Sequence, residues 1–378
     1  MKSSVRLAGV GGLALAATAI FAVPASASPA HHPSPHRAAV FVQTDNPSGN
    51  AVVAYRRSPD GSLHRRGTYA TGGLGGVLAG SVVDHLASQG SLTYDRARGL
   101  LYAVNAGSNT ITSFTVRGDR LSRHQVTSSG GSFPVSIAEH GHLVYVLNAR
   151  NGGSIQGYLR VGDTLLRIPA WHRSLGLDPT MTPEFTSTPG QVTFTPDGSK
   201  LIVTTKANGN AIDVFALHGL RGPSTTPVVN VEPAAVPFAL TFDAAGHLVV
   251  TEAGPNAVAT FRLHRDGTLS AITQAATGQA ATCWILRVGA NFYASNAGSG
   301  TVSGYQDRGA GALQALGTTA TDPGTVDSAA TAGGRYVYVQ TGANGIVDEY
   351  RVGDRGSLTP LGSVTVPDAV GGEGIAAS

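Results

Sequence analysis

The chain repeats one pattern of apolar and polar positions. In each repeat an apolar strand ends in a small polar motif, a turn follows, and a second apolar strand ends near an aromatic residue. The motifs are FVQTDN at 41–46, YAVNAG at 102–107, YVLNAR at 145–150, IVTTKA at 202–207, VVTEAG at 249–254, YASNAG at 293–298 and YVQTGA at 338–343. The aromatic residues follow nine to eleven positions after each motif's polar position, at Tyr55, Phe114, Tyr158, Phe215, Phe261, Tyr305 and Tyr350. The repeats therefore predict a series of short strands joined by tight turns.

The spacing of the repeats predicts the architecture. Successive motifs lie 43–47 residues apart where no insertion intervenes, and turns such as Asp60-Gly61 and Asp266-Gly267 mark hairpins. Repeats of about 40–50 residues that each hold several short strands are typical of β-propellers. We expect an all-β protein, a seven-bladed β-propeller of four-stranded blades, over residues 39–378.

The ends of the repeat region predict how the ring closes. The first repeat lacks the inner strand that opens the others, and the last residues, Gly372–Ser378, resemble a lone inner strand. We expect this C-terminal strand to complete the first blade, because closure removes exposed strand edges. Two insertions lengthen the spacing, at Gly72–Gly80 and Leu175–Pro189. The glycines of the first do not follow a strand-to-helix pattern, which favours a mobile loop over a nucleotide-binding loop.

The N-terminus has the pattern of an export signal. Residues 1–27 combine a short basic start, an apolar run and Ala25-Ser26-Ala27, small residues suited to a signal peptidase. The run is shorter than the ~20 apolar residues that a membrane span needs, so we expect cleavage, secretion and no stable membrane insertion. Residues 28–38 are rich in proline and histidine. They predict a disordered linker, and loose metal binding by the histidines is the less favoured interpretation.

Composition excludes several classes of protein. Only 13% of the 378 residues are charged, 42% are hydrophobic and one is cysteine. This excludes a disordered chain, a disulfide framework and a multi-thiolate zinc site. The mature chain has nearly balanced charge, so a nucleic-acid partner is not expected. The standard catalytic and metal-binding motifs are absent, and the sequence predicts a monomer without metal or cofactor.

Candidate functional residues follow from the propeller model. The loops after each second strand and before each inner strand gather at one mouth of the central channel. Asn105, Asn148 and Asn296 end second strands, where they either contact substrate or cap their own turns. Glu252 breaks the pattern by placing a carboxylate at this position. If partly desolvated it suits general acid or base catalysis, and the alternative is a solvated loop acid.

Three further residues are candidates for substrate binding at the same mouth. Lys206 lies just past the equivalent position in the blade before Glu252, and an ion pair between the two is one hypothesis. Gln191 and Trp284 lie at the entrances of inner strands. Trp284 is either a stacking surface for a sugar or lactone ring or a core residue.

Several segments resemble one known family. SQGSL (88–92), VNAGSNTI (104–111), PVSIA (134–138), LVYVLNA (143–149), FTPDGSKLIVT (194–204), TCWIL (282–286) and SNAGSGTVSGY (295–305) are similar to the lactonase family. Its members are seven-bladed propellers related to bacterial 6-phosphogluconolactonase and fungal 3-carboxymuconate lactonizing enzyme. The resemblance implies that Glu252 matches an active-site glutamate. The family's charged inner-strand entrances are replaced by Pro237-Phe238-Ala239 and Gly190-Gln191, which disfavours an anionic substrate.

Two main functions remain open. One is a secreted hydrolase that opens a small lactone or sugar-like ligand, with Glu252 as general base and the asparagines polarising the carbonyl. The other is a non-catalytic propeller that binds a glycan, peptide or cell-wall ligand, because one fold hosts many functions. A lactonizing isomerase is a third, weaker option.

Overall fold

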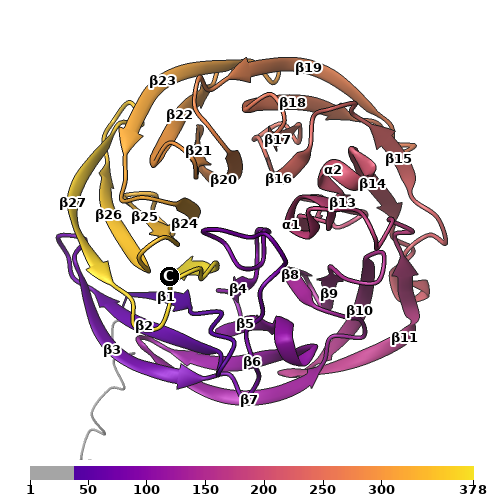
Figure 1. The fold of residues 1–378 in the computed structure, drawn as a ribbon, viewed down its shortest axis with the longest axis horizontal. Coiled ribbons are helices and arrows are strands. Elements are labelled where there is room, and N and C mark those ends of the chain that lie inside the picture. Colours follow the sequence, from indigo (N-terminus) through magenta and orange to yellow (C-terminus); the bar gives the residue numbers. More distant parts are fainter. Residues whose placement is uncertain (1–37) are drawn as a thin grey trace, which may run out of the picture. The chain divides into compact units, whose positions relative to one another are not determined.

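The computed structural model describes residues 38–378, which form a ring of seven four-stranded antiparallel sheets (Figure 1). The predicted seven-bladed β-propeller is therefore confirmed. In every blade the strands pair in chain order from the centre of the ring outward, except that the first blade borrows its inner strand from the C-terminus. The predicted signal peptide and nearly all of the predicted linker lie outside the described residues. No helix within residues 38–378 is long and apolar enough to cross a membrane.

The strands have the following bounds. Blades 1 to 4 contain β1 (Ala39–Gln43), β2 (Ala51–Arg57), β3 (Leu63–Ala70); β4 (Leu92–Asp95), β5 (Leu100–Asn105), β6 (Thr110–Arg117), β7 (Arg120–Ser128); β8 (Pro134–His140), β9 (Leu143–Asn148), β10 (Ser154–Val161), β11 (Thr164–Ser174); β12 (Gln191–Phe194), β13 (Lys200–Thr204), β14 (Ala211–Ala216) and β15 (Val228–Val231). Blades 5 to 7 contain β16 (Pro237–Phe242), β17 (Leu248–Glu252), β18 (Ala257–Leu263), β19 (Leu269–Ala276); β20 (Thr282–Val288), β21 (Asn291–Asn296), β22 (Thr301–Asp307), β23 (Leu313–Ala320); β24 (Thr325–Ala330), β25 (Tyr336–Thr341), β26 (Ile346–Val352) and β27 (Leu358–Thr365). The short helices are α1 (Glu184–Ser187), α2 (Lys206–Gly209) and two 3₁₀ turns at Ala106–Ser108 and Gly219–Arg221.

Burial along the strands explains their sequence patterns. Second strands such as β5 and β25 are buried at every position, since neighbouring blades cover both of their faces. Outer strands such as β7 and β19 are largely exposed and carry polar residues. The continuous apolar runs in the sequence are therefore the middle layers of the blades.

The closing strand is β28 (Ile375–Ala377), and it confirms the predicted closure. It pairs antiparallel with β1, with Ile375 opposite Val42 and Ala377 opposite Val40. Arg96, in the turn after β4, donates from its guanidinium to the carbonyl oxygens of Ala377 and Ala330. One side chain of blade 2 thus contacts both sides of the seam where the chain ends meet.

The repeated aromatic residue ties neighbouring blades together. All seven are at most 3% exposed. Four tyrosine hydroxyls donate to a carbonyl oxygen at the end of the preceding blade's outer strand: Tyr55 to Thr365 at 3.4 Å, Tyr158 to Ser128 at 2.5 Å, Tyr305 to Ala276 at 3.4 Å and Tyr350 to Ala320 at 2.7 Å. The sequence repeat therefore encodes contacts between blades as well as the hairpins inside them.

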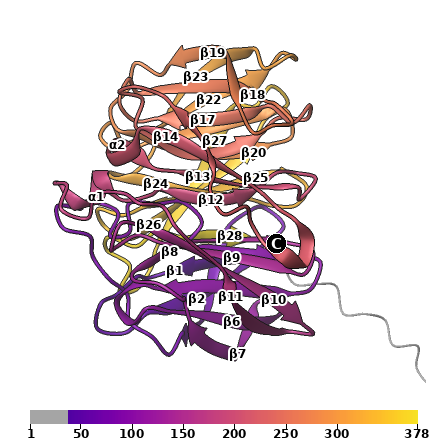
Figure 2. The same cartoon turned by 90° about the vertical axis from the view of Figure 1, so that its right-hand side faces the viewer.

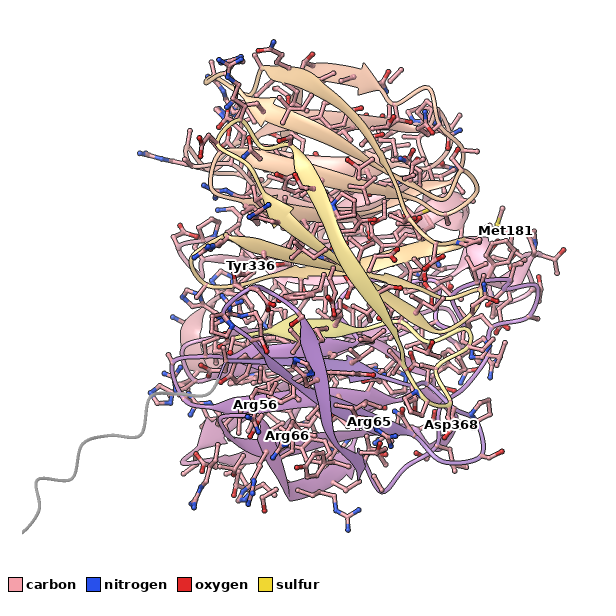
Figure 3. The ribbon with its side chains drawn as sticks, turned by 90° about the vertical axis from the view of Figure 1, so that its left-hand side faces the viewer. Arg56, Arg65, Arg66, Met181, Tyr336 and Asp368 are labelled. Atoms are coloured by element: carbon pink, nitrogen blue, oxygen red, sulfur yellow. The ribbon has the colours of Figure 1, made fainter. Side chains whose placement is uncertain are left out.

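Charge also links the outer edges of blades 1 and 2. Arg56 and Arg66, labelled in Figure 3, lie on β2 and β3. Their Nε atoms are 3.1 and 3.3 Å from Oδ2 of Asp119 in the turn between β6 and β7. Because both arginine side chains are more than a third exposed, solvent screening limits the stabilisation to well under about 1 kcal/mol for each pair.

The two insertions lie on the same face of the ring. The connection from β3 to β4 enters the middle of the ring in Figure 1, and α1 of the second insertion lies toward one face in Figure 2. The amide nitrogen of Ala79 donates to Glu184 Oε2 at 2.7 Å, and that of Phe185 donates to the Ala79 carbonyl. Leu78 and Leu86 are fully buried. Within Gly72–Gly80 the residues Gly75, Gly76 and Leu78 are buried and five others are exposed. The segment is therefore anchored at a few buried positions, and its expected mobility stays a prediction.

Candidate functional site

The channel mouth chosen from the sequence is closed by the connection Gly72–Gly90, which we call the plug. Gln89 crosses to blade 6, where its amide donates to the Ile285 carbonyl at 3.0 Å and accepts from the Ile285 amide at 2.8 Å. The Ser88 hydroxyl donates to the Val135 carbonyl of blade 3, and the His85 amide donates to the Gly371 carbonyl. The plug is therefore hydrogen-bonded to several sides of the ring.

Trp284 is one of the anchors of the plug. Its indole Nε1 donates to the Ser88 carbonyl at 2.5 Å, and its ring meets Phe238 edge-on with centroids 5.0 Å apart. The side chain is only 3% exposed. In this structure Trp284 is a core residue that holds the plug, as one of the two sequence interpretations predicted.

Lys206, at the start of α2, is a second anchor. Its Nζ donates to the carbonyl oxygens of Ala87 at 2.6 Å and Phe185 at 2.5 Å, and so binds both insertions. Burial lowers the pKa of Lys206 to about 7, and the nearby Asp84 carboxylate opposes that shift. The hypothesis of an ion pair with Glu252 is wrong: among the described residues Nζ is occupied by these oxygens and the Thr188 hydroxyl.

Glu252 ends β17 and is 3% exposed. Its Oε2 accepts a hydrogen bond from the side-chain amide of Gln274 on β19 at 2.5 Å. Burial raises the pKa of the Glu252 carboxyl, as general acid or base work would require. However, Glu252 borders none of the three cavities described below, and its bond runs outward within its own blade.

The three candidate asparagines are buried inside their blades. The amide nitrogen of Asn105 donates to the hydroxyls of Thr110 and Thr112, five and seven positions later. Asn296 repeats this geometry with Thr301 and Ser303. These bonds lock the hairpin that follows each second strand. Asn148 instead donates to the Ser129 carbonyl at 3.3 Å.

Gln191 is the one predicted residue that borders a cavity. Its Oε1 accepts from the Leu240 amide at 2.6 Å, which bridges blades 4 and 5. It also lines a cavity of about 330 Å³ between the inner strands β4, β8 and β12. A smaller cavity of about 150 Å³ lies beside α1.

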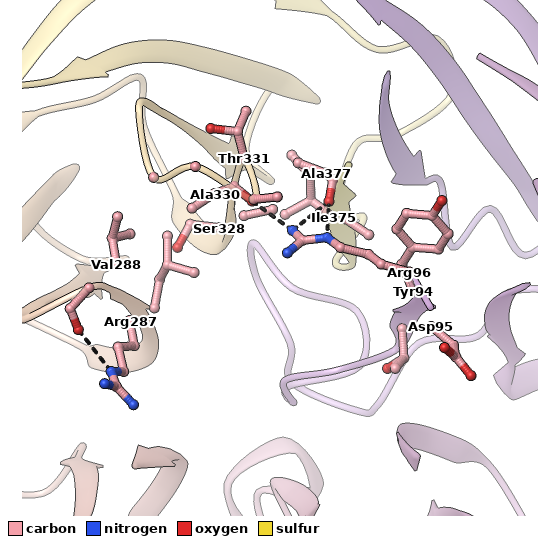
Figure 4. A pocket seen from close by; sticks show the side chains of 18 of the residues that line it. Tyr94, Asp95, Arg96, Arg287, Val288, Ser328, Ala330, Thr331, Ile375 and Ala377 are labelled. Atoms are coloured by element: carbon pink, nitrogen blue, oxygen red, sulfur yellow. Dashed lines mark hydrogen bonds between the residues drawn. The ribbon is translucent and has the colours of Figure 1, made fainter. Parts of the chain in front are cut away.

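The main cavity, about 1080 Å³, lies at the opposite end of the channel from the plug. We call it the chamber. It is formed by the turns that follow β4, β8, β20 and β24 and by β28. Figure 4 shows Arg96 reaching across it toward Ala330 and Ala377, and Arg287 at its other side. The sequence analysis missed this end, because it followed the motifs at the ends of the second strands and those motifs face the plug.

The chamber is polar and carries charge of both signs. Arg287 donates from Nε to the Gly289 carbonyl and from Nη1 to the Phe242 carbonyl, which leaves Nη2 outside these bonds. Nη1 of Arg96 likewise takes no part in its carbonyl contacts. Glu139, at the end of β8, also lines the chamber. Burial, and secondarily the nearby Asp95 carboxylate, raises the pKa of Glu139.

Beneath the plug lies a group of buried carboxylates. Asp45, Asp84, Asp327 and Glu373 are each at most 6% exposed. Burial raises the pKa of Asp45 to about 8 and that of Asp327 to about 7, and it raises that of Glu373 well above its usual value. Within residues 38–378 no three His, Cys, Asp or Glu side chains are arranged to hold one metal ion by themselves.

Comparison with known proteins gives the fold. No protein-family model matches the sequence, and no curated protein matches it. A Bacteroides uniformis protein provisionally assigned as a 6-phosphogluconolactonase superposes with a TM-score of 0.73 at 18% identity, over 91% of this chain and 100% of its own. The periplasmic gluconolactonase of Pseudomonas aeruginosa gives a TM-score of 0.71 at 17% identity, over 90% of this chain and 98% of its own. This chain shares their fold.

The same propeller architecture also serves other chemistry. Virginiamycin B lyase from Staphylococcus aureus superposes with a TM-score of 0.55 at 12% identity, over 76% of this chain and 88% of its own. A lyase and a lactonase thus use similar rings. For this propeller the function has to be argued from the site.

Proposed function

We propose that the protein is an exported lactonase-like propeller that binds a small, polar, sugar-like or lactone ligand in the chamber. The chamber itself carries the proposal. Its volume, about 1080 Å³, is in the range of small-molecule sites, and it lies at the end of the channel away from the plug. The N-terminal sequence pattern supports export.

The polar groups of the chamber suit such a ligand. Arginine N–H groups from two blades line the chamber and suit oxygen-rich ligands, and Ser328 and Thr331 add hydroxyls. Glu139 accepts hydrogen bonds from ligand hydroxyls when it is ionised. A glycan end, a sugar acid or a lactone carries the matching donors and acceptors. The plugged mouth lacks this room, because Trp284, Lys206 and Gln89 are engaged in holding the plug.

Hydrolysis of a lactone in the same chamber is the second candidate. Glu139 favours it, because burial raises the pKa of this carboxyl and it lines the same cavity as Arg96 and Arg287, whose N–H groups suit polarising a carbonyl. In this scheme Glu139 takes a proton from water as the water oxygen attacks the lactone carbonyl. The tetrahedral intermediate then breaks its bond to the ring oxygen, which receives the proton back from Glu139. The gluconolactonase fold neighbour supports the same candidate.

A matched pair of blocking variants tests the chamber. Ala332→Trp places a large ring in the exposed turn that borders the chamber, and Val82→Trp places the same ring on the plug, where Val82 is 83% exposed. We expect calorimetric titration of residues 28–378 with lactones and their open-chain acids to show binding that Ala332→Trp abolishes and Val82→Trp preserves. Binding lost only in Val82→Trp would place the ligand at the plug and overturn the proposal.

A pH-stat assay on the same panel separates binding from catalysis. Turnover above the spontaneous rate that falls by about 100-fold or more in Glu139→Gln would establish hydrolysis in the chamber. Turnover that falls in Glu252→Gln instead would return the active site to the position chosen from the sequence. Binding without turnover would leave the protein as a binding propeller.

A further inference from the structure

The seam of the ring buries more carboxyl groups than the positive charges of the described residues neutralise. Asp45, Asp84, Asp327 and Glu373 come from four separate segments: the β1–β2 connection, the plug itself, β24 and the segment before β28. Lys206 is the one amine that couples to this group, and it does so through Asp84. Buried carboxylates without a counter-charge are costly, so this group requires either protons or a cation.

Three buried oxygens at the seam have no hydrogen-bond donor within residues 38–378. They are Oε1 of Glu373, Oε1 of Gln43 and Oε1 of Gln340. All three side chains are at most 1% exposed. Buried polar atoms are nearly always paired, so three unpaired acceptors in one region call for a group that donates hydrogen bonds or for a cation.

Hydrogen bonds connect the residues that carry these oxygens. The side-chain nitrogen of Gln43 donates to Oδ1 of Asp45, which joins the Gln43 amide to that carboxylate. The side-chain nitrogen of Gln340, on blade 7, donates to the backbone carbonyl of Gln43 at 3.4 Å. The amide of Glu373 donates to Oδ2 of Asp45 at 2.7 Å. Blade 1, blade 7 and the closing segment therefore meet at this point.

The Glu373 carboxylate is poorly supplied with donors. The Ser88 hydroxyl is 3.3 Å from its Oε2 but 2.9 Å from the Val135 carbonyl. A hydroxyl donates one proton, so the Ser88 hydroxyl donates to the closer acceptor, the Val135 carbonyl, and not to Glu373. A group of oxygen atoms that receives few hydrogen bonds is a suitable set of ligands for a hard cation. It is unsuitable for a thiophilic transition metal.

We propose that the seam binds one calcium-like cation through the carboxylates of Asp45 and Glu373 and the amide oxygens of Gln43 and Gln340. Two carboxylates alone do not enclose an ion, and the amide oxygens complete the set. Calcium accepts such mixed oxygen ligands at irregular angles, whereas magnesium demands a regular octahedron. A bound ion here would tie blade 7, the closing segment and blade 1 together, so ring stability would depend on it. This inference is independent of what the chamber binds.

Calcium binding to the wild-type protein is the direct test. Residues 28–378 are stripped with EDTA and titrated calorimetrically with CaCl₂ at pH 7.5, with MgCl₂ in parallel. We expect one calcium per chain and, at about 100 times Kd, a rise in Tm of about 3 °C or more, with a smaller effect of magnesium. Absence of calcium binding in the wild-type protein would overturn the proposal without recourse to any variant.

Isosteric variants then separate a cation from protons. Glu373→Gln and Asp45→Asn remove the charges but keep the shape, and we expect both to lose the calcium-dependent rise in Tm. Asp213→Asn is the matched control, because Asp213 is another buried carboxyl with an unpaired oxygen and lies on β14. It should keep the full calcium response. If Glu373→Gln raises Tm equally with and without calcium, the carboxylates hold protons and the cation site is refuted.

Discussion

Removal of the closing strand should destabilise the whole propeller. A variant that ends at Gly371 loses β28 and with it the inner strand of blade 1. Burial of Ile375, which is 4% exposed, is worth about 2–3 kcal/mol. The lost hydrogen bonds include Gln43 N to Gly374 O and Ser378 N to Ala39 O, each worth about 1 kcal/mol. With the remaining ladder and the Arg96 contacts, the loss is about 5–8 kcal/mol, comparable with the stability of many domains.

Urea unfolding followed by tryptophan fluorescence measures this loss. We expect the truncated chain to unfold at a much lower urea concentration than the parent, or to lack a cooperative transition at 25 °C. Ile375→Ala gives a graded version and should cost about 2–4 kcal/mol. Val370→Ala, at a 61% exposed position just before the closing segment, is the control and should change little. A truncated protein that unfolds like the parent would refute the role of β28.

Three further outcomes follow from buried polar groups. Burial raises the pKa of Asp213 to about 6 in the folded protein, whereas the unfolded chain has a pKa near 4. Protonation of Asp213 therefore stabilises the folded state by about 3 kcal/mol at low pH, and this stabilisation is lost as the pH rises through 6. Asp213→Asn should flatten the stability profile between pH 4 and 6, and an unchanged slope would contradict this origin. Trp284→Phe keeps an aromatic ring but removes the indole N–H that donates to Ser88, so amide exchange in the plug should accelerate about 5–30-fold while the outer strands keep their protection. Tyr158→Phe should lower the free energy of unfolding by about 1 kcal/mol, whereas Phe215→Tyr, at a repeat position without a hydroxyl, should give no gain if no acceptor is in reach.

The blades could be predicted from local patterns in the sequence. Alternation, glycine turns and the recurring aromatic residue act within about 45 residues, so each repeat specifies its own hairpins and the contact with its neighbour. The count of repeats, with the unpaired first blade, also predicted β28 as the closing strand. The burial of Asn105 and Asn296 in hairpin locks was one of the two interpretations that the sequence left open, and the hydroxyls five and seven positions later were the available signal.

Which end of the channel is open was decided only by tertiary structure. The plug has no periodic pattern, and its position depends on contacts with residues as distant as Ile285 and Gly371. The direction of the Glu252 side chain likewise depends on Gln274 of the outer strand, which the motif does not contain. Asp45, Asp84, Asp327 and Glu373 are unremarkable as separate acids in the sequence. They become neighbours only because ring closure brings the two ends of the chain to the same seam. Burial at the seam raises their pKa values, and no local sequence pattern predicts that burial.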